Sequence, residues 1–242
     1  MTSVSPSPTS ASRITLTRLG SEGVGALLIT RMLPATFFLM VAVARAQRFP
    51  SLFHLPPSDA GALVRATALA QIAYHGSVIF FLLLVSWLFI ARLQPVRKSA
   101  GWRPRLTALL GAFLLSFIAA APHSEATVLR TASATLLMVS GSAITLAALF
   151  ALGRSFSIFP EARRLITTGP YAVVRHPMYA GEILAGLGLT LQALSPLATL
   201  LFALFLIAQL VRMRDEERIL EHTFPEYAAY KRRTARLIPR IY

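Results

Sequence analysis

The chain has 242 residues, of which 55% are hydrophobic and 14% are charged, and its mean hydropathy is +0.61. An average soluble domain is about 45–50% apolar and about 25% charged, so this composition excludes an ordinary soluble enzyme and favours a membrane protein. The net charge is +14. The basic residues lie in short segments between apolar runs, which is typical of membrane orientation, and we expect no nucleic-acid partner. The absence of cysteine excludes disulfides, thiolate metal ligands and a cysteine nucleophile.

Three regions follow each other along the chain. Residues 1–23 begin as a Ser/Pro/Thr-rich polar tail, a composition that predicts disorder. Residues 24–152 are rich in apolar runs and predict a region of four membrane helices. Residues 153–242 combine a helical hairpin with two clusters of polar side chains, so any chemistry is expected there.

The predicted fold class is all-α: a polytopic membrane protein with about six transmembrane helices, each requiring roughly 20 mostly apolar residues. The six apolar segments are Val24–Ala46, Ala66–Ala91, Leu106–Ala121, Thr131–Leu152, about Tyr179–Leu194, and Pro196–Met213. The break at Ser195-Pro196 makes the last two an antiparallel hairpin. Residues 214–233 carry apolar side chains at helical spacing, which predicts an amphipathic C-terminal helix. That helix lies either on the cytoplasmic membrane surface or on the protein's own loops.

The distribution of arginine predicts orientation. Residues 92–105, residues 153–176 and the C-terminal tail are rich in basic side chains, whereas residues 122–130 and 193–196 are poor in them. By the positive-inside rule, both termini and the two polar clusters are cytoplasmic. With 22 Arg and two Lys, the composition resembles that of a bacterial protein. The prediction is therefore an integral protein of a bacterial inner membrane.

The first polar cluster places Tyr171, Arg175, His176 and Tyr179 within nine residues. Charged and titratable groups are costly near lipid, so such a cluster indicates a functional site. Pro177 suits the first turn of a helix, and His176 and Tyr179 then share one face. The positive end of that helix would suit an anionic group. The alternative is an interfacial Arg/Tyr anchor without a ligand.

The second cluster, Arg212 to Glu217, follows the last apolar run. Arg212 and Glu216 are four residues apart and share a helix face. The alternative is a solvated charge run where the helix leaves the lipid. Glu182 lies at a similar depth on the preceding helix. The histidines show no metal-ligand spacing, and no metal site is predicted.

Residues 153–242 resemble the isoprenylcysteine carboxyl methyltransferase (ICMT-like) family of integral membrane methyltransferases. The matching blocks are Leu165-Ile166-x-x-Gly169-Pro170-Tyr171, Arg175-His176-Pro177-x-Tyr179-x-Gly181, Glu216-Glu217-x-x-Leu220, Phe224-x-Glu226-Tyr227-x-x-Tyr230 and Ile238-Pro239. The five blocks are in the family's order and spacing. Pro225 stands where the family usually has glycine, and the first four helices carry no motif.

The resemblance implies S-adenosyl-L-methionine as cofactor, bound without a Rossmann fold. Its implied cofactor-binding residues are Arg164, Leu165, Ile166, Tyr171, His176, Pro177, Met178, Tyr179, Glu216 and Glu217. Arg212 and Glu216 are the implied catalytic residues. Arg212 and Glu182 are the substrate-binding candidates, and Glu161 is the candidate for a further upstream contact.

The predicted function is methyl transfer to a lipophilic small molecule or lipid that enters from the bilayer, with a carboxylate as the acceptor (O-methylation). Phospholipid N-methylation and thiol S-methylation stay open. An NADPH-dependent membrane reductase of the sterol or steroid type is an alternative, since such enzymes share the RHPxYxG block and some have a glycine–acid pair like Gly181-Glu182. Met178 in place of asparagine and the Gly169-Pro170-Tyr171 turn weigh against it. A non-enzymatic scaffold is a third reading.

Overall fold

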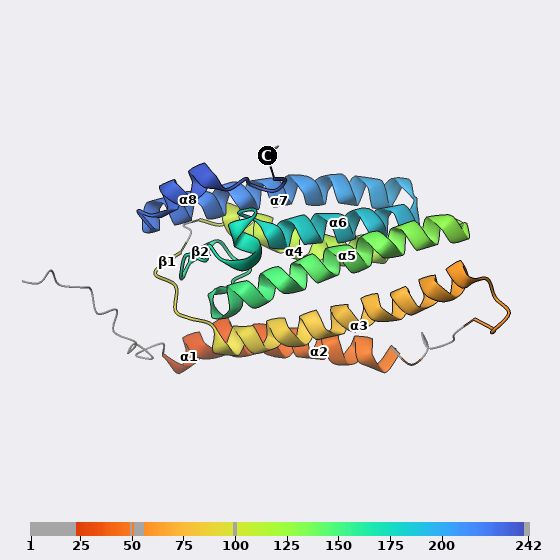
Figure 1. Ribbon diagram of the computed structural model, residues 1–242. Coiled ribbons are helices and arrows are strands. Elements are labelled where there is room, and N and C mark those ends of the chain that lie inside the picture. Colours follow the sequence, from red (N-terminus) through yellow and green to blue (C-terminus); the bar gives the residue numbers. More distant parts are fainter. Residues whose placement is uncertain (1–22, 49, 51–55, 99–100, 240–242) are drawn as a thin grey trace, which may run out of the picture.

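The apolar segments form long helices that run side by side, as Figure 1 shows. This computed structural model describes residues 23–48, 50, 56–98 and 101–239; the predicted disorder of the N-terminal tail falls on residues outside this range. The helices are α1 Val24–Leu27, a π-helical turn Leu28–Met32, α2 Leu33–Arg48, α3 Ala62–Ala91, α4 Arg103–Ala119, α5 Val128–Leu152, α6 Pro177–Ala193, α7 Pro196–Thr223 and α8 Tyr227–Arg233. Short 3-10 turns cover Gly153–Ser155 and Gly169–Ala172.

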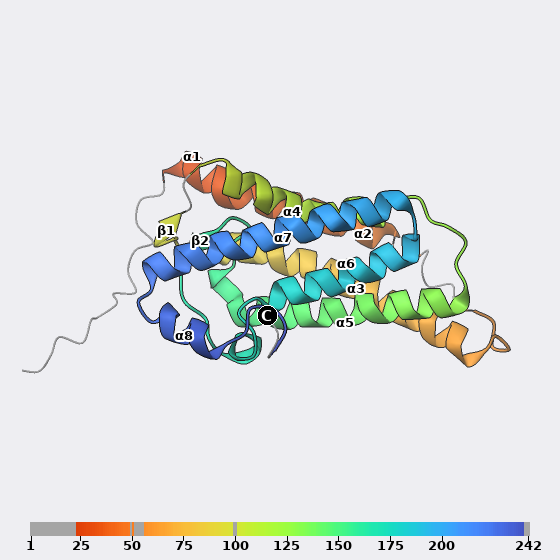
Figure 2. The same ribbon diagram turned by 90° about the horizontal axis from the view of Figure 1, so that it is seen from above.

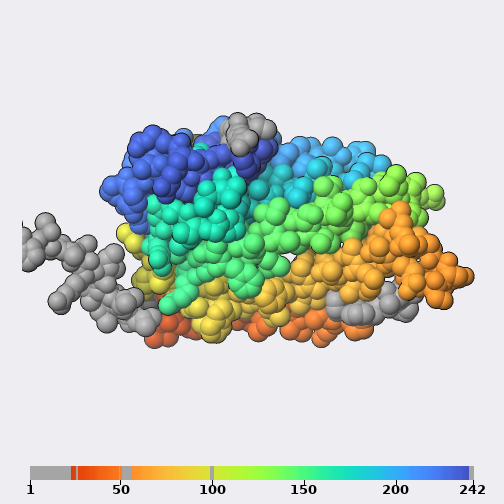
Figure 3. All heavy atoms as spheres, in the orientation of Figure 1, coloured from red at the N-terminus to blue at the C-terminus, as the bar shows by residue number. Residues whose placement is uncertain are grey.

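Each of the six predicted apolar segments is helical over nearly all of its length, although α4 ends at Ala119 and α6 at Ala193, and the all-α polytopic prediction is confirmed. In the described part of the chain, four helices are long and apolar enough to cross a membrane: Leu28–Arg48, Ala62–Ala91, Val128–Ser155 and Pro196–Thr223. The helices α4 and α6 are shorter, at 17 residues each, and pack beside α7 and α5. Figure 3 shows the resulting elongated body, with the C-terminal residues gathered at one end.

The helix α7 is longer than its apolar run. It continues without a break from Pro196 to Thr223, because no helix-breaking residue follows Met213 until Pro225. At 1.5 Å per residue its 28 residues extend about 42 Å, more than the roughly 30 Å of a bilayer's hydrocarbon core. The predicted amphipathic helix is therefore divided between the polar end of α7 and the short α8.

Small residues bring α5 and α6 into close contact. A Cβ atom added at Gly181 would lie 2.6 Å from the carbonyl oxygen of Gly141, and one at Gly188 would lie 2.7 Å from the carbonyl oxygen of Ala134. Small residues at such spacing allow membrane helices to pack backbone against backbone. Gly181 and Ala185 are both buried in this contact with α5.

The basic segments lie at one end of the bundle. Figures 1 and 2 place α8, the turn before α6 and the two-residue strands β1 (Arg97–Lys98) and β2 (Glu161–Ala162) at that end, whereas the α4–α5 and α6–α7 connections and the start of α3 lie at the other. The strands pair antiparallel. Together these segments form a polar cap over the helix ends.

Candidate functional site

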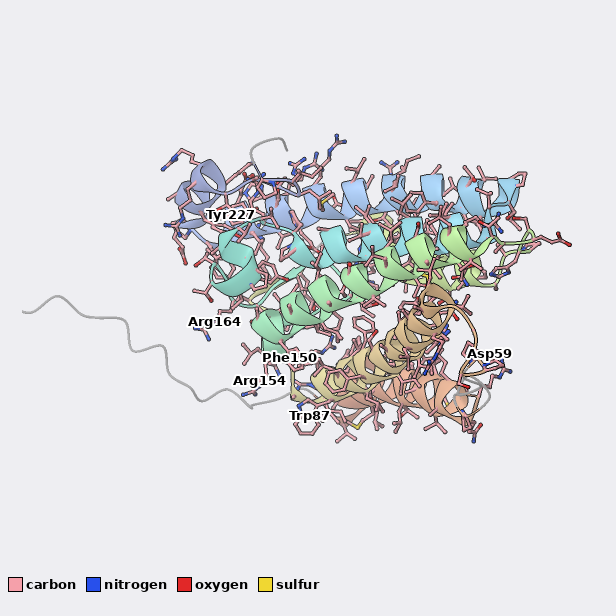
Figure 4. The ribbon with its side chains drawn as sticks, turned by 45° about the vertical axis from the view of Figure 1, so that its right-hand side comes forward. Asp59, Trp87, Phe150, Arg154, Arg164 and Tyr227 are labelled. Atoms are coloured by element: carbon pink, nitrogen blue, oxygen red, sulfur yellow. The ribbon has the colours of Figure 1, made fainter. Side chains whose placement is uncertain are left out.

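A small polar pocket of about 90 Å³ lies in this cap, between the 155–166 segment, the start of α6 and the end of α7. Its lining includes eight of the predicted cofactor-binding residues: Arg164, Leu165, Ile166, Tyr171, His176, Met178, Tyr179 and Glu216. Glu161, the candidate upstream contact, also lines it. Pro177 and Glu217 do not, although both are buried. Figure 4 labels Arg164 and another lining residue, Tyr227, at this end of the bundle.

The turn before α6 is held from behind by α8. Gly169 has a φ of +62°, a conformation that glycine adopts easily, and Pro170 continues the turn. The hydroxyl of Tyr230 donates a 2.7 Å hydrogen bond to the carbonyl of Tyr171. Burial raises the pKa of Tyr230 to about 12 and raises the pKa of Tyr171 well above its usual value. Both phenols therefore stay neutral around the pocket.

Glu217 is the centre of a buried cationic cluster. Its carboxylate accepts hydrogen bonds from Arg175 Nε at 2.9 Å and Arg236 Nη2 at 2.6 Å, and lies 3.1 Å from His176 Nε2. The backbone amide of Arg175 also donates to the carbonyl of Ala235 at 2.8 Å. Glu217 thus ties the C-terminal segment to the start of α6. The sequence resemblance implies contact between Glu217 and the cofactor; in the structure Glu217 lies behind the pocket lining, in contact with Arg175, His176 and Arg236.

Glu216, the neighbour of Glu217, faces the pocket. Its carboxylate accepts a hydrogen bond from the hydroxyl of Tyr179 and lies 3.9 Å from His176 Nδ1. The rings of His176 and Tyr179 are 5.5 Å apart, as expected for residues three apart on a helix. The predicted pair Tyr179 and Glu216 therefore meets within one pocket.

A second, larger cavity of about 380 Å³ lies inside the bundle, between α2, α3, α4, α5, α6 and α7. We call it the apolar chamber. Most of its lining is aromatic or aliphatic, and Glu182 and Arg212 are among its few charged residues. Met178 lines both the pocket and the chamber. The guanidinium of Arg212 lies over the ring of Tyr179, so this pair stands where the two spaces adjoin.

Glu182 and Arg212 are connected through Gln209, which the sequence reasoning did not single out. Arg212 Nη1 donates to Gln209 Oε1 at 2.9 Å, and Gln209 Nε2 donates to Glu182 Oε2 at 2.5 Å. The available signal was a polar amide inside an apolar run, three residues before Arg212. The substrate-binding candidates thus share one buried polar chain.

The donor set of the polar pocket fits an adenosylated sulfonium. Carboxylates at Glu161 and Glu216 suit ribose hydroxyls or an ammonium group, and the guanidinium of Arg164 suits a carboxylate. The aromatic rings of Tyr171 and Tyr179 suit a purine or a cation.

Fold and site together define a polytopic helical membrane protein with a polar pocket at one end and an apolar chamber between its helices. The sequence profile of the phospholipid methyltransferase family matches residues 129–227. Cobalt-zinc-cadmium resistance protein CzcN of Cupriavidus metallidurans is 42% identical over 32% of this chain, and nickel-cobalt-cadmium resistance protein NccN of Alcaligenes xylosoxydans is 35% identical over 45%. Protein-S-isoprenylcysteine O-methyltransferase of Saccharomyces cerevisiae is 32% identical over 56%.

Residues 129–227 are therefore similar to the phospholipid methyltransferase family, and the chain is similar over about half its length to protein-S-isoprenylcysteine O-methyltransferases. The matched segments cover 36%, 52% and 60% of the three relatives. The resemblance stated from the sequence motifs is confirmed, and the matched region contains the pocket residues on α6 and α7.

Proposed function

We propose that this protein transfers a methyl group from S-adenosyl-L-methionine to a lipophilic acceptor held in the apolar chamber. The observation that carries the proposal is the junction of the two spaces: Met178 lines both, and the Tyr179–Arg212 pair stands between them. A water-soluble cofactor and an apolar acceptor can therefore approach one point from different phases.

Arg164, Tyr171, Tyr179 and Glu216 would hold the cofactor. When bound, it supplies an activated methyl group on a sulfonium. The chain's own contribution is then to orient the acceptor and to exclude water, and positioning of this kind can lower a barrier by roughly 7–11 kcal/mol. Met178 and the ring of Tyr179, both buried, form the dry wall at the junction.

The acceptor would enter from the bilayer, because the chamber lies among helices long enough to span it. Arg212, as the sequence resemblance implies, would lie beside the acceptor's head group. A carboxylate acceptor held by Arg212 is the sequence-based expectation. The contacts of Arg212 favour a different head group, since both terminal nitrogens already face Gln209 and the carbonyl of Ile158, and Nε is buried.

We also propose that the cofactor pocket and both termini are cytoplasmic, in a bacterial inner membrane. The support is that the Arg-rich segments gather at the pocket end. The chain has no cysteine, so single cysteines are clean probes. Arg232→Cys should resist an impermeant maleimide added to intact cells, whereas Ser124→Cys at the opposite end should react. The reverse pattern contradicts the orientation.

Calorimetry on purified protein in detergent tests the function. S-adenosylhomocysteine should bind the wild type, Glu216→Ala should lose at least tenfold in affinity, and the exposed control Glu125→Gln should be unchanged. Binding of NADPH without binding of S-adenosylhomocysteine would favour the reductase reading. Binding of neither ligand would favour the scaffold reading.

A further inference from the structure

Glu182 carries a carboxylate oxygen that remains open to the apolar chamber. Its Oε2 accepts the hydrogen bond from Gln209, and Oε1 has no hydrogen-bond partner among the described residues. Oε1 is not sealed by protein, because Glu182 is half-buried and lines the chamber. A carboxylate oxygen left open inside an apolar cavity is costly unless a donor satisfies it.

The direction of the Gln209 amide is settled by chemistry. A guanidinium only donates, so the oxygen of Gln209 must face Arg212 and its NH₂ group must face Glu182. Glu182 Oε2 is therefore an acceptor, and a proton on Glu182 would reside on Oε1. The chain Arg212–Gln209–Glu182 aims an accepting oxygen into the chamber.

Arg212 offers little to an acceptor's head group. Nη1 donates to Gln209, Nη2 donates to the carbonyl of Ile158 at 3.3 Å, and Nε is buried and has no hydrogen-bond partner among the described residues. The residue is only 3% exposed and lies over the ring of Tyr179. A third charged residue of the lining, Arg45, is in the last turn of α2, at the end opposite the polar pocket.

We infer that Glu182 binds the acceptor's nucleophilic group as a hydrogen-bond donor and removes its proton, so that the acceptor is a lipophilic hydroxyl, thiol or amine and not a carboxylate. This inference rests on the proposed function. A lone pair of the acceptor's oxygen, sulfur or nitrogen forms the bond to the methyl carbon, and the bond from that carbon to the cofactor's sulfur breaks and leaves a neutral thioether. The proton passes to Glu182 Oε1 and leaves to water once the product departs.

Binding of chain-matched probes to the protein in lipid nanodiscs tests the head group. The probes are dodecylamine, dodecanethiol, a dodecylphenol and dodecanoic acid, and Glu125→Gln, an exposed carboxylate outside the chamber, controls for partition into lipid. At least one donor-headed probe should bind about tenfold more tightly than the acid, and Glu182→Gln should abolish that preference. Equal affinity for all four, including no binding, overturns the inference, as does a preference that survives in Glu182→Gln.

Methyl transfer to the preferred probe tests proton removal. A lost general base should lower kcat about a hundredfold or more in Glu182→Gln, with partial recovery in Glu182→Asp. S-adenosylhomocysteine affinity should stay at the wild-type value in both, which also reports that they fold. Unchanged kcat in Glu182→Gln, or methylation of dodecanoic acid, overturns the inference. If the wild-type protein does not bind S-adenosylhomocysteine, the proposed function itself is refuted.

Discussion

The central guanidinium carbon of Arg212 lies 4.8 Å from the centre of the Tyr179 ring, and the same tyrosine donates its hydroxyl hydrogen to Glu216. The ring therefore links the polar pocket to the apolar chamber. A cation over an aromatic face in a desolvated site contributes about 2 kcal/mol. The hydroxyl of Tyr179 contacts Glu216 in the polar pocket, and its ring contacts Arg212 beside the apolar chamber. Substitutions that remove one contact at a time should therefore affect either cofactor binding or acceptor binding, but not both.

Tyr179→Phe keeps the ring beneath Arg212 and removes the hydroxyl that bonds to Glu216. We expect S-adenosylhomocysteine affinity to fall about five- to tenfold, from the loss of roughly 1 kcal/mol of hydrogen bonding, while the KM for the acceptor stays unchanged. Calorimetry and steady-state kinetics measure the two quantities. A change in acceptor KM with intact cofactor affinity would contradict this division.

Arg212→Lys should keep the charge but lose the fork that reaches both Gln209 and the carbonyl of Ile158. We expect kcat to fall about a hundredfold, because Gln209 would no longer be fixed toward Glu182, with little change in S-adenosylhomocysteine affinity. The matched control is Arg214→Lys, an exposed position two residues away. If the two variants have the same kcat, Arg212 does not contribute to the reaction.

Glu217→Gln should destabilise the polar cap. The substitution removes the charge that faces Arg175 and Arg236, and breaking a buried pair costs about 3–5 kcal/mol. Thermal unfolding in detergent should show a clear drop in Tm. The control, Glu221→Gln, removes the half-exposed partner of Lys231 and should cost less than about 1 kcal/mol. Similar losses for both variants would show that the buried ion pairs of Glu217 stabilise the fold no more than an exposed ion pair does.

Gly181→Ala tests the α5–α6 contact. Its new Cβ would lie 2.6 Å from the carbonyl oxygen of Gly141, which is backbone and cannot turn aside, so we expect a loss of about 1–3 kcal/mol. Gly25→Ala, whose Cβ would meet nothing within 4 Å, is the control. Thermal unfolding in detergent measures the stability of both variants. If Gly181→Ala is as stable as the wild type, α5 and α6 can move apart without a loss of stability.

Alkaline unfolding reports on Tyr230. Its pKa is raised to about 12 in the folded protein by burial, against about 10 for an exposed tyrosine, so the unfolded chain loses the proton first. Stability should be complete below about pH 10 and decrease as pH rises from about 10 to 12. Tyr230→Phe should flatten that decrease and cost about 1 kcal/mol at neutral pH through the lost bond to Tyr171. A slope equal to that of the wild type would contradict the assignment.

The apolar segments could be read from the sequence because burial in lipid imposes a local rule on each segment alone. The hairpin break at Ser195-Pro196 was equally local: Leu194 takes a positive φ of 42°, and Ser195 Oγ caps the amide of Ala198. The end of α7 was misplaced, since the change from apolar to charged residues at Met213 marks the limit of lipid contact, not the limit of the helix.

By itself, the sequence determined the helical membrane class, the clusters around His176 and Glu216, and the family they resemble, because each rests on residues close together in the chain. Only the tertiary structure decided which of two adjacent glutamates faces the pocket. Consecutive helical residues point about 100° apart, and what packs on either side chooses between Glu216 and Glu217. The bond from Gln209 to Glu182 likewise joins two helices across 27 residues, and no pattern within one helix encodes the direction of its neighbour.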